Sequence, residues 1–340
     1  MMTADLEMIA DSEVMDSFTK TDLIETEVVE INIEAENIIS LELRSEIVGE
    51  ILPRFTPGSH IDIVLPIGLC RSYSLVNSTE NFDRYVIAVQ RDPHSTGGSA
   101  YIHDHVKPGD RLTINHPRNH FPLDESAAHS VFIAGGIGIT PLWCMIQRLE
   151  SLGRSWELHY AARNPARAAF LNSIVQVGER SDRRVESVFD AEPGAVRLDI
   201  GSIVGEAPKD SHFYCCGPIS MLSAFEESTT EIEPGRVHME YFKPRGPLAT
   251  NLAEFSVELR KSAKILTIEP GRSILDCVRA AGVPVNFSCQ QGLCGLCETK
   301  VLSGTPEHHD SVLTEEERVS NNVMMICCST SKSKRLVLDL

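Results

Sequence analysis

Three of the ten cysteines in the sequence lie close together near the C-terminal end. Cys289, Cys294 and Cys297 follow a C-x4-C-x2-C spacing, and Cys327 lies far downstream of them. A cluster of two irons needs four converging thiolates, so three ligands on one loop require a fourth from a distant segment. This spacing is typical of a plant-type [2Fe–2S] cluster.

Part of this cysteine spacing also suits other chemistry. The last two cysteines of the loop form a C-x-x-C pair, which by itself would suit zinc or a thiol redox pair equally well. The four-residue step and the single remote cysteine depart from the paired spacing of zinc sites, so the iron–sulfur interpretation is favoured. Gly292 and Gly295 separate the ligands, where a chain that wraps around sulfur needs positive φ and amides directed at sulfur. Cys328 adjoins Cys327 and is an alternative fourth ligand.

Composition narrows the class of protein. With 340 residues, 42% of them hydrophobic, the chain is long enough for two or three packed domains. A net charge of −17 argues against nucleic acid and anionic membranes as partners. The longest apolar run, Val131 to Ile146, is broken by glycine and proline and is too short to span a membrane. Cysteines without an export signal favour a reducing compartment, and we expect a cytoplasmic protein.

The elements that would position these residues fall into several regions. Residues 1–22 form an acidic, weakly patterned segment that we expect to be a mobile tail of unassigned purpose. In residues 23–123, short β-branched segments separated by P-G and polar turns predict an antiparallel β-barrel. The expected strands are 28–33, 38–43, 61–65, 73–76, 84–91 and 111–114.

Three segments of this barrel are candidates for binding a flavin. G-G-S before an expected helix at 100–105 offers free N–H groups and the positive end of the helix dipole to a phosphate. In R-S-Y-S, the arginine is a charged donor and the tyrosine a flat apolar surface. Each segment alone is a weak signal, since G-G-S is usually only a loop. The candidates are Arg71, Ser72, Tyr73, Ser74, Ala88, Val89, Gln90, Gly97, Gly98 and Ser99.

Residues 124–242 have the pattern of a doubly wound α/β domain. A buried strand at 130–134, the turn G-G-I-G-I-T-P and an apolar helix form a nucleotide-binding half-unit, with Thr140 as the expected N-cap and Pro141 at N1. Pro141 stands where the standard fingerprint has its third glycine, so the dinucleotide should bind differently from that in a standard Rossmann enzyme. Further strands at 156–162, 184–189 and 212–216 alternate with helices at 166–178 and 220–229, which predicts a parallel sheet.

The carboxyl edge of that sheet is the expected dinucleotide site. Cys216 either lines this site or is simply a small buried residue. Arg163 ends its strand, and either contacts adenosine phosphates or is a solvated charge. The candidates are Gly135, Gly136, Gly138, Thr140, Arg163, Cys216, Gly217 and Pro218.

The last domain follows a short strand at 236–242 and a Pro/Gly-rich linker at 243–250. Residues 251–340 contain expected strands at 255–260, 264–268 and 335–338, a helix ending at Ala281, and the cysteine loop. This pattern predicts a small α+β fold around the cluster. The whole chain is therefore expected to be a multidomain protein: a β-barrel, a doubly wound α/β domain and an α+β ferredoxin domain.

Taken together and in this order, the motifs resemble the phthalate dioxygenase reductase family, single-chain reductases that supply electrons to Rieske oxygenases. The likeness runs from about residue 23 to the end. It includes R-S-Y-S-L, V-I-A-V-x-R-D, P-R-N-x-F-P-L-D, A-G-G-I-G-I-T-P, Y-C-C-G-P and C-x-S-x-x-K-S. The resemblance implies an FMN-binding barrel, an NADH-binding domain and a C-terminal [2Fe–2S] domain, with a separate aromatic dioxygenase or O-demethylase as partner.

The resemblance also implies roles for individual residues. Arg71, Tyr73 and Ser74 would contact the flavin, and Gly97, Gly98 and Ser99 would hold its phosphate. Thr140 and Cys216 would line the nicotinamide pocket, and Phe242 in E-Y-F would stack on the isoalloxazine. Cys327 rather than Cys328 would be the fourth ligand. Gln90 is a departure, because members of the family often have lysine there.

Chemically, this organisation converts a two-electron donor into a one-electron donor: NADH gives a hydride, which a flavin accepts and a cluster does not. Some alternatives stay open. FAD would replace FMN if an adenine is accommodated, and Arg163 and Arg167 would tolerate the 2′-phosphate of NADPH. Two further hypotheses for the function of the whole chain are a reductase that serves another acceptor, such as a di-iron hydroxylase, and a zinc-stabilised binding module.

Overall fold

The computed structural model describes residues 23–47, 49–191, 194, 197–244 and 253–340. The predicted tail at 1–22 and most of the predicted linker at 243–250 lie outside these residues. The chain divides into two compact units. One contains Leu23–Leu65 and Ser72–Phe242, and the other contains Pro66–Arg71 and Lys243–Leu340.

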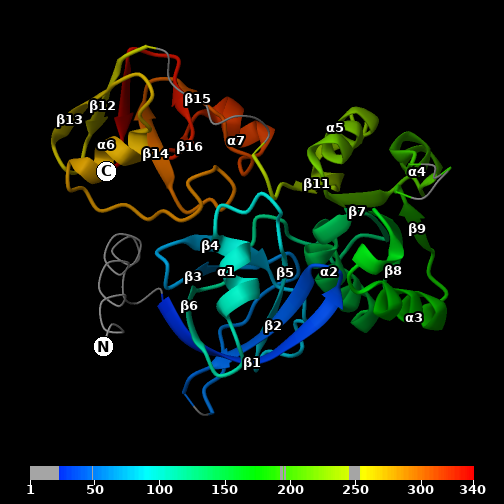
Figure 1. The fold of residues 1–340 in the computed structure, drawn as a ribbon. Helices are drawn as coiled ribbons and strands as arrows, with labels where there is room; N and C mark the ends of the chain where they lie inside the picture. The colour runs from blue at the N-terminus through cyan, green and yellow to red at the C-terminus, as the bar shows by residue number, and fades with distance from the viewer. Residues whose placement is uncertain (1–22, 48, 192–193, 195–196, 245–252) are drawn as a thin grey trace, which may run out of the picture. The chain divides into compact units, whose positions relative to one another are not determined.

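An antiparallel six-stranded sheet is formed by residues 23–115 (Figure 1). Its strands are β1 (Leu23–Ala35), β2 (Ile38–Ser45), β3 (His60–Val64), β4 (Cys70–Ser74), β5 (Tyr85–Gln90) and β6 (Arg111–Asn115), in the order β4-β3-β6-β1-β2-β5. The two ends of this order meet, because Leu75 bridges Ile87 and the Val76 amide donates to the Val86 carbonyl over 2.8 Å. The sheet therefore closes into a barrel, and α1 (Gly98–His105) packs beside β5, with His103 Nε2 2.9 Å from the Val89 carbonyl oxygen.

A five-stranded parallel sheet follows, in the order β11-β10-β7-β8-β9. Its strands are β7 (His129–Gly135), β8 (Ser155–Ala162), β9 (Val185–Phe189), β10 (Ser211–Cys216) and β11 (Val237–Glu240). Its helices are α2 (Ile139–Ser151), α3 (Leu171–Ser181), α4 (Ile200–Glu206) and α5 (Ile219–Ser228), with short 3-10 turns at Gly136–Gly138, Pro165–Arg167 and Pro234–Arg236. The chain leaves β7 toward β8 on one side and reaches β10 on the other, so the topological switch lies between β7 and β10.

One predicted helix is wrong in its bounds. Residues 166–178 were expected to form a single helix, but the chain makes a 3-10 turn at Pro165–Arg167 and begins α3 only at Leu171. Phe170 has a left-handed φ of 59°, which no continuous α-helix contains. The short helix α4 was not predicted, since its seven residues include two glycines.

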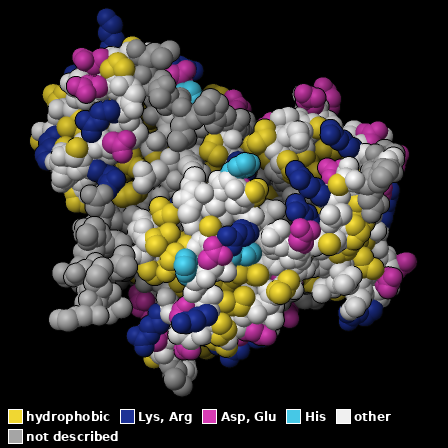
Figure 2. Space-filling view, viewed as in Figure 1, with side chains coloured by type: hydrophobic (Ala, Val, Ile, Leu, Met, Phe, Trp, Pro, Cys, Tyr) yellow, Lys and Arg dark blue, Asp and Glu magenta, His cyan; other side chains and the backbone are white. Residues whose placement is uncertain are grey.

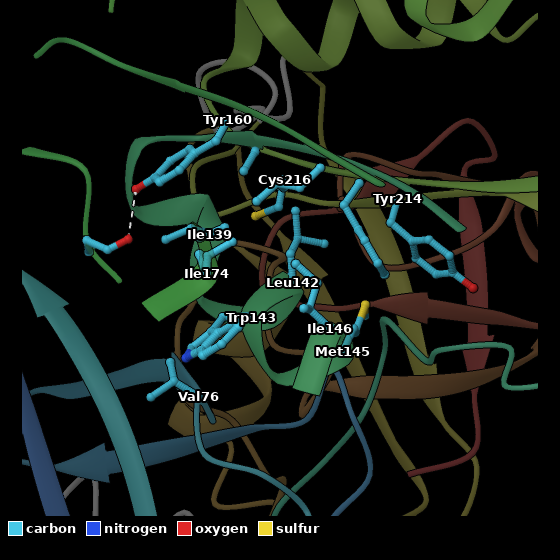
Figure 3. Close-up of a cluster of buried hydrophobic side chains, with 14 of the residues drawn as sticks. Val76, Ile139, Leu142, Trp143, Met145, Ile146, Tyr160, Ile174, Tyr214 and Cys216 are labelled. Atoms are coloured by element: carbon cyan, nitrogen blue, oxygen red, sulfur yellow. Dashed lines mark hydrogen bonds between the residues drawn. The ribbon is translucent and has the colours of Figure 1, made fainter. Parts of the chain in front are cut away.

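The barrel and the parallel sheet share a hydrophobic core (Figure 3). Ile38, Val76 and Ala88 come from the barrel and pack with α2 residues that include Trp143 and Met145. The Gln147 side-chain amide also donates to the Val76 carbonyl over 2.8 Å. Apolar burial of this kind stabilises by about 25 cal/mol for each Å² removed from water, so the two sheets are held as one body.

The second unit has its own core and its own mixed sheet. Its five-stranded sheet, in the order β13-β12-β18-β14-β16, is built from β12 (Phe255–Leu259), β13 (Lys264–Ile268), β14 (Glu298–Ser303), β16 (Val323–Met325) and β18 (Arg335–Leu338), and β15 (Pro306–Glu307) pairs with β17 (Thr330–Ser331). Helix α6 (Ile274–Ala280) is N-capped by Ser273, whose hydroxyl accepts from the Asp276 amide, and α7 (Glu315–Ser320) begins with a capping box. The cysteine loop connects α6 to β14.

Candidate functional site

The loop that carries the three clustered cysteines has an unusual backbone. Gly292 and Gly295 have φ of 69° and 73°, values that glycine adopts without strain. A Cβ at Gly292 would come 2.6 Å from the Cys328 sulfur and 2.9 Å from the Cα of Asp310. The loop is therefore pressed against the segments around Asp310 and Cys328, and glycine is required at this point for steric reasons.

The four predicted ligands come together as two pairs. The Cys289 thiol is hydrogen-bonded with that of Cys294, and the Cys297 thiol with that of Cys327. The pairing with Cys294, helped by amides that donate to sulfur, holds the pKa of Cys289 below its usual range against the opposing effect of burial. The pairing with Cys327 and burial raise the pKa of Cys297. Two irons with two thiolates each require this arrangement of donors, so the residues present fit a [2Fe–2S] cluster.

Backbone amides also point at one of these sulfurs. The amides of Gln291 and Leu293 lie 3.3 and 3.4 Å from the Cys289 sulfur. Such donors stabilise a thiolate and, when a cluster is bound, tune its reduction potential. In the described ranges, no three His, Cys, Asp or Glu side chains are grouped around a point that a single metal ion would occupy.

Cys328 was the alternative to Cys327. Its thiol is buried and lies 3.8 Å from the Met325 carbonyl, toward which it is oriented as a donor. Cys327 is the partner of Cys297, and its thiol also interacts with that of Cys328. Cys327 as the fourth ligand stays a prediction.

The carboxyl edge of the parallel sheet is formed by backbone rather than by side chains. A Cβ at Gly138 would lie 2.2 Å from the Cys216 carbonyl oxygen, and one at Gly135 would lie 2.4 Å from a Pro218 side-chain carbon. A Cβ at Gly217 would likewise lie close to the neighbouring turn, 3.1 Å from the Cα of Gly135. The turn after β7 and the turn after β10 are thus packed backbone to backbone at the topological switch, where such folds bind their ligands.

Thr140 does not have the role in the helix that its type predicted. Helix α2 begins at Ile139, its N-cap is Gly138, and no side chain caps it. Thr140 is buried inside the first turn, and its hydroxyl donates to the Ile137 carbonyl over 2.9 Å. The N-cap prediction is wrong because the 3-10 turn at Gly136–Gly138 leads directly into α2 and starts the helix earlier. Pro141 consequently lies within the first turn rather than at N1.

Two titratable groups adjoin at this edge. Cys216 ends β10 and is fully buried, and burial raises the pKa of its thiol so that it stays neutral. Glu240 ends β11 and is the register partner of Cys216. Its Oε2 is buried with no hydrogen-bond partner among the described residues, and burial raises the pKa of Glu240 to about 8. A buried acid without a partner costs stability unless a ligand uses it.

Sequence reasoning missed Glu240. In the E-Y-F stretch, the prediction concerned the aromatic residue Phe242, which is 37% exposed. The available signal was the acidic side chain itself, because a buried carboxylate at the end of a short strand is unusual. Arg163 follows the end of β8 and is exposed.

The predicted flavin segments occupy adjacent elements. β4 carries R-S-Y-S, β5 carries A-V-Q, and the bridge between Leu75 and Ile87 sets the end of one beside the other. Gly97 has a φ of 108° and precedes α1, whose first amides are free of intrahelical bonds. Ser99 is partly engaged, since its hydroxyl accepts from the Asp92 amide over 3.2 Å. Arg71 donates to the Cys70 carbonyl over 2.8 Å.

A buried ionic network behind β4 was also missed. Asp62 is fully buried and accepts from Ser72 at 2.5 Å, from Asn115 at 3.1 Å and from Arg118 at 2.6 Å. Burial alone would raise the pKa of Asp62, but the Arg118 guanidinium holds it below the usual range. The network holds the Ser72 side chain in place. It also gives a structural role to Arg118, the arginine of the P-R-N-x-F-P-L-D motif, as the charged partner of Asp62.

Comparison with known proteins adds three findings. Residues 257–332 match the family model of the 2Fe-2S iron-sulfur cluster binding domain. The chain is 49% identical over 306 residues to phenoxybenzoate dioxygenase subunit beta of Ectopseudomonas oleovorans, covering 90% of this chain and 94% of that protein. It is 48% identical over 320 residues to tetrachlorobenzoquinone reductase of Sphingobium chlorophenolicum, covering 93% and 98%.

A solved structure agrees with these matches. The solved structure of phthalate dioxygenase reductase, described as a modular structure for electron transfer from pyridine nucleotides to [2Fe–2S], matches with a TM-score of 0.69 and 36% identity. The match covers 94% of this chain and 98% of that one. Across the described residues, no helix has both the length and the apolar character that a membrane crossing demands.

Proposed function

Because the chain belongs to the phthalate dioxygenase reductase family, we propose that it oxidises NADH on FMN and passes single electrons through a [2Fe–2S] cluster to a separate Rieske-type aromatic oxygenase. The predicted family and fold class are confirmed by the relatives and by the solved structure. The chain is accordingly a flavin and iron–sulfur oxidoreductase that serves an oxygenase. The identities of the flavin and the nucleotide, and the residues that hold each group, belong to the proposal.

Pairing of the four thiols is the observation that carries the proposal. Cys289 with Cys294 and Cys297 with Cys327 would each hold one iron, while the amides of Gln291 and Leu293 donate to sulfur. When bound, the flavin accepts a hydride and releases electrons singly, and the cluster carries one electron at a time. The loop glycines keep the chain close around the sulfurs.

At the sheet edge, the chain would position the nicotinamide. The glycines add no side chain of their own at this edge, where Pro218 and Met221 are the neighbouring side chains, so a flat ring would approach the backbone there. Thr140 and Cys216 are buried at this edge and offer a hydroxyl oxygen and a neutral thiol. Glu240 keeps its proton at neutral pH, since its pKa is raised to about 8, so it would donate a hydrogen bond to a carboxamide oxygen.

FMN is favoured over FAD by the phosphate site at the start of α1. The free amides after Gly97, at the positive end of a helix, suit a terminal phosphate. Tyr73 and Ser74 on β4 and Ala88, Val89 and Gln90 on β5 would flank the ring system, Arg71 would supply a charged donor, and Phe242 would cover the ring. Mass spectrometry of the cofactor released by heat decides between the two flavins.

One test addresses the whole proposal. Purified protein should show flavin absorption together with a cluster shoulder, should reduce cytochrome c with NADH, and should leave aromatic substrates unchanged until an oxygenase is added. Conversion of a substrate by the protein and NADH alone would contradict the proposal. A colourless protein that contains zinc would favour the binding-module alternative. A cytoplasmic location stays a prediction, based on the cysteines.

A quinone is the second candidate acceptor, because a 48% identical relative is named for tetrachlorobenzoquinone reduction. Quinones accept electrons directly from reduced flavin, so this activity does not need the iron–sulfur unit. A variant without the cluster would separate the two functions. If quinone reduction persists and oxygenase support is lost, the chain can serve both acceptors, and a quinone rate far above the oxygenase rate would make the quinone the main one.

A further inference from the structure

The edge of the parallel sheet near β8 carries two arginines where an adenosine ribose is expected. In dinucleotide-binding folds, the strand after the glycine-rich turn ends beside this ribose, with an acidic residue for the 2′-hydroxyl or an arginine for a 2′-phosphate. Here β8 ends at Ala162 and is followed by Arg163, and Arg167 ends the next 3-10 turn. By residue type alone, this edge would suit NADPH.

One of the two arginines is engaged by a carboxylate from a distant part of the chain. Glu36 lies in the turn between β1 and β2 and binds Arg167 in a bidentate pair, with Nη2 3.0 Å from Oε1 and Nε 3.2 Å from Oε2. The bond with Arg167 lowers the pKa of Glu36, so the carboxylate is charged at neutral pH. Arg163 has no ion pair with any residue in the described ranges.

The position of Glu36 does not depend on its side chain. Its backbone amide donates to the Ala166 carbonyl over 2.7 Å, and the neighbouring Ile38 is buried in the core shared with α2. On the other side, the Asn164 side chain accepts from the Arg167 amide over 3.1 Å and fixes the 3-10 turn. The hairpin tip and the turn are therefore held together by backbone and core contacts, and the ion pair is added to an arrangement that exists without it.

We infer that Glu36 is a specificity determinant that makes the dinucleotide site prefer NADH to NADPH. It occupies the donors of Arg167 that a 2′-phosphate would need. Glu36 acts through Arg167 and is therefore a positioning residue. The inference rests on the proposed function, since it takes a nicotinamide dinucleotide to be the electron donor.

The charge balance of the surface fits this local mechanism. On the face drawn in Figure 2, basic and acidic side chains are interspersed rather than gathered by sign. With a net charge of −17, the chain as a whole repels both nucleotides, and it repels NADPH more because of the charge of the 2′-phosphate. Salt screens such long-range repulsion, so strong discrimination needs a close contact, and an arginine with or without a carboxylate partner is such a contact.

The test compares NADPH and NADH as donors for cytochrome c reduction by the holoprotein. In the variant Glu36→Gln, the ratio of kcat/KM for NADPH to that for NADH should rise by about tenfold or more, because a hydrogen bond between charged groups contributes on the order of that factor. The gain should appear mainly as a lower KM for NADPH. Adding Arg167→Gln should abolish the gain, and Glu36→Asp should leave most of the discrimination in place.

A matched control is Glu30→Gln, which removes one exposed carboxylate from β1, the strand that leads into the turn of Glu36. The NADPH to NADH ratio should stay at its wild-type value in this variant. An unchanged ratio in Glu36→Gln would overturn the inference, as would an equal rise in the control. A rise that persists in the double variant with Arg167→Gln would also overturn it, because Arg167 would then have no part in the effect.

Measurements of nucleotide binding test the role of Glu36 separately from the proposed function. Adenosine 2′,5′-bisphosphate and adenosine 5′-monophosphate, titrated by calorimetry, differ by the 2′-phosphate alone. Glu36→Gln should tighten the first about tenfold relative to the second. A wild-type protein that fails to oxidise NADH would contradict the proposed function, while the two titrations would still decide the role of Glu36.

Discussion

The cysteine loop and the carboxyl edge of the parallel sheet are built by opposite means. The loop brings four side chains to one place, and three of them come from nine consecutive residues, Cys289 to Cys297. The edge brings backbone segments together, from the turns after β7 and β10, with only one acidic side chain nearby. Side-chain chemistry leaves a spacing in the sequence, whereas close backbone approach leaves only glycines, which have many other uses.

The largest expected effect comes from breaking the loop. Cys294→Ser should remove the cluster, with a loss of iron affinity of more than ~100-fold, since even changes outside the ligand set cost that much. Cytochrome c reduction should fall to background while NADH-dependent ferricyanide reduction by the flavin persists. Iron analysis and the visible spectrum measure the loss.

Cys328→Ser is the matched control for that variant, because its thiol is oriented toward the Met325 carbonyl. It should keep its iron, and Cys327→Ser should not. The reverse result would transfer the fourth ligand position to Cys328.

The sheet edge should be sensitive to a single methyl group. In Gly138→Ala, the new Cβ would lie 2.2 Å from the Cys216 carbonyl oxygen, so the two turns must separate at a cost of roughly 1–3 kcal/mol. The KM for NADH should rise and the midpoint of urea unfolding should fall, while iron content stays normal. Gly205→Ala, where nothing lies within 4 Å, should leave both unchanged. Equal behaviour of the two variants would contradict the close packing.

A smaller, pH-dependent effect is expected at Glu240. Its raised pKa of about 8 means that the native state retains a proton which the unfolded chain releases above its ordinary value of 4.5. The stabilising contribution of the protonated acid is complete below pH 4.5 and is lost as pH rises through 8, so wild-type stability should decline across that window.

Glu240→Gln removes the titration but keeps a hydrogen-bond donor. Its urea midpoint should vary less between pH 5.5 and 8.5 than that of the wild type, and its KM for NADH should stay flat where the wild-type KM rises above pH 8. Identical pH profiles for the two proteins would show that the carboxyl group is solvated.

The smallest expected effect is at Thr140, whose hydroxyl is committed to the Ile137 carbonyl. Thr140→Val should cost about 1 kcal/mol, the contribution of one neutral hydrogen bond. The KM for NADH should change by less than about threefold, which corresponds to less than one such bond. A tenfold change in KM would instead identify the hydroxyl as a direct contact of the nicotinamide.

The sequence was sufficient where chemistry and local patterning coincide. The spacing of Cys289, Cys294 and Cys297 identified the kind of cluster, and the final strand at 335–338 was predicted with its observed bounds. The barrel and the doubly wound sheet followed from alternation and turn residues. The predicted domain boundaries and site residues stay predictions.

The rest depended on contacts between residues far apart in the chain. Asp62 binds Arg118 across 56 residues, and Glu36 binds Arg167 across 131. No local pattern marks either pair. The wrong N-cap prediction at Thr140 has a similar origin. Gly138, in the 3-10 turn before α2, packs on Cys216, which is far away in the sequence. Residue preferences for helix caps carry no information about that contact.

The core shared by the barrel and the parallel sheet has a consequence for protein engineering. Val76 and Ile38 are buried against α2, so a chimera joined near residue 124 would expose apolar surface on both of its halves. A junction at residue 243 would leave this core and the core of residues 255–340 whole, and would part only Pro66–Arg71 from the rest of its unit. Exchange of electron-transfer modules between relatives should therefore succeed for the iron–sulfur unit alone and fail for the nucleotide-binding half alone.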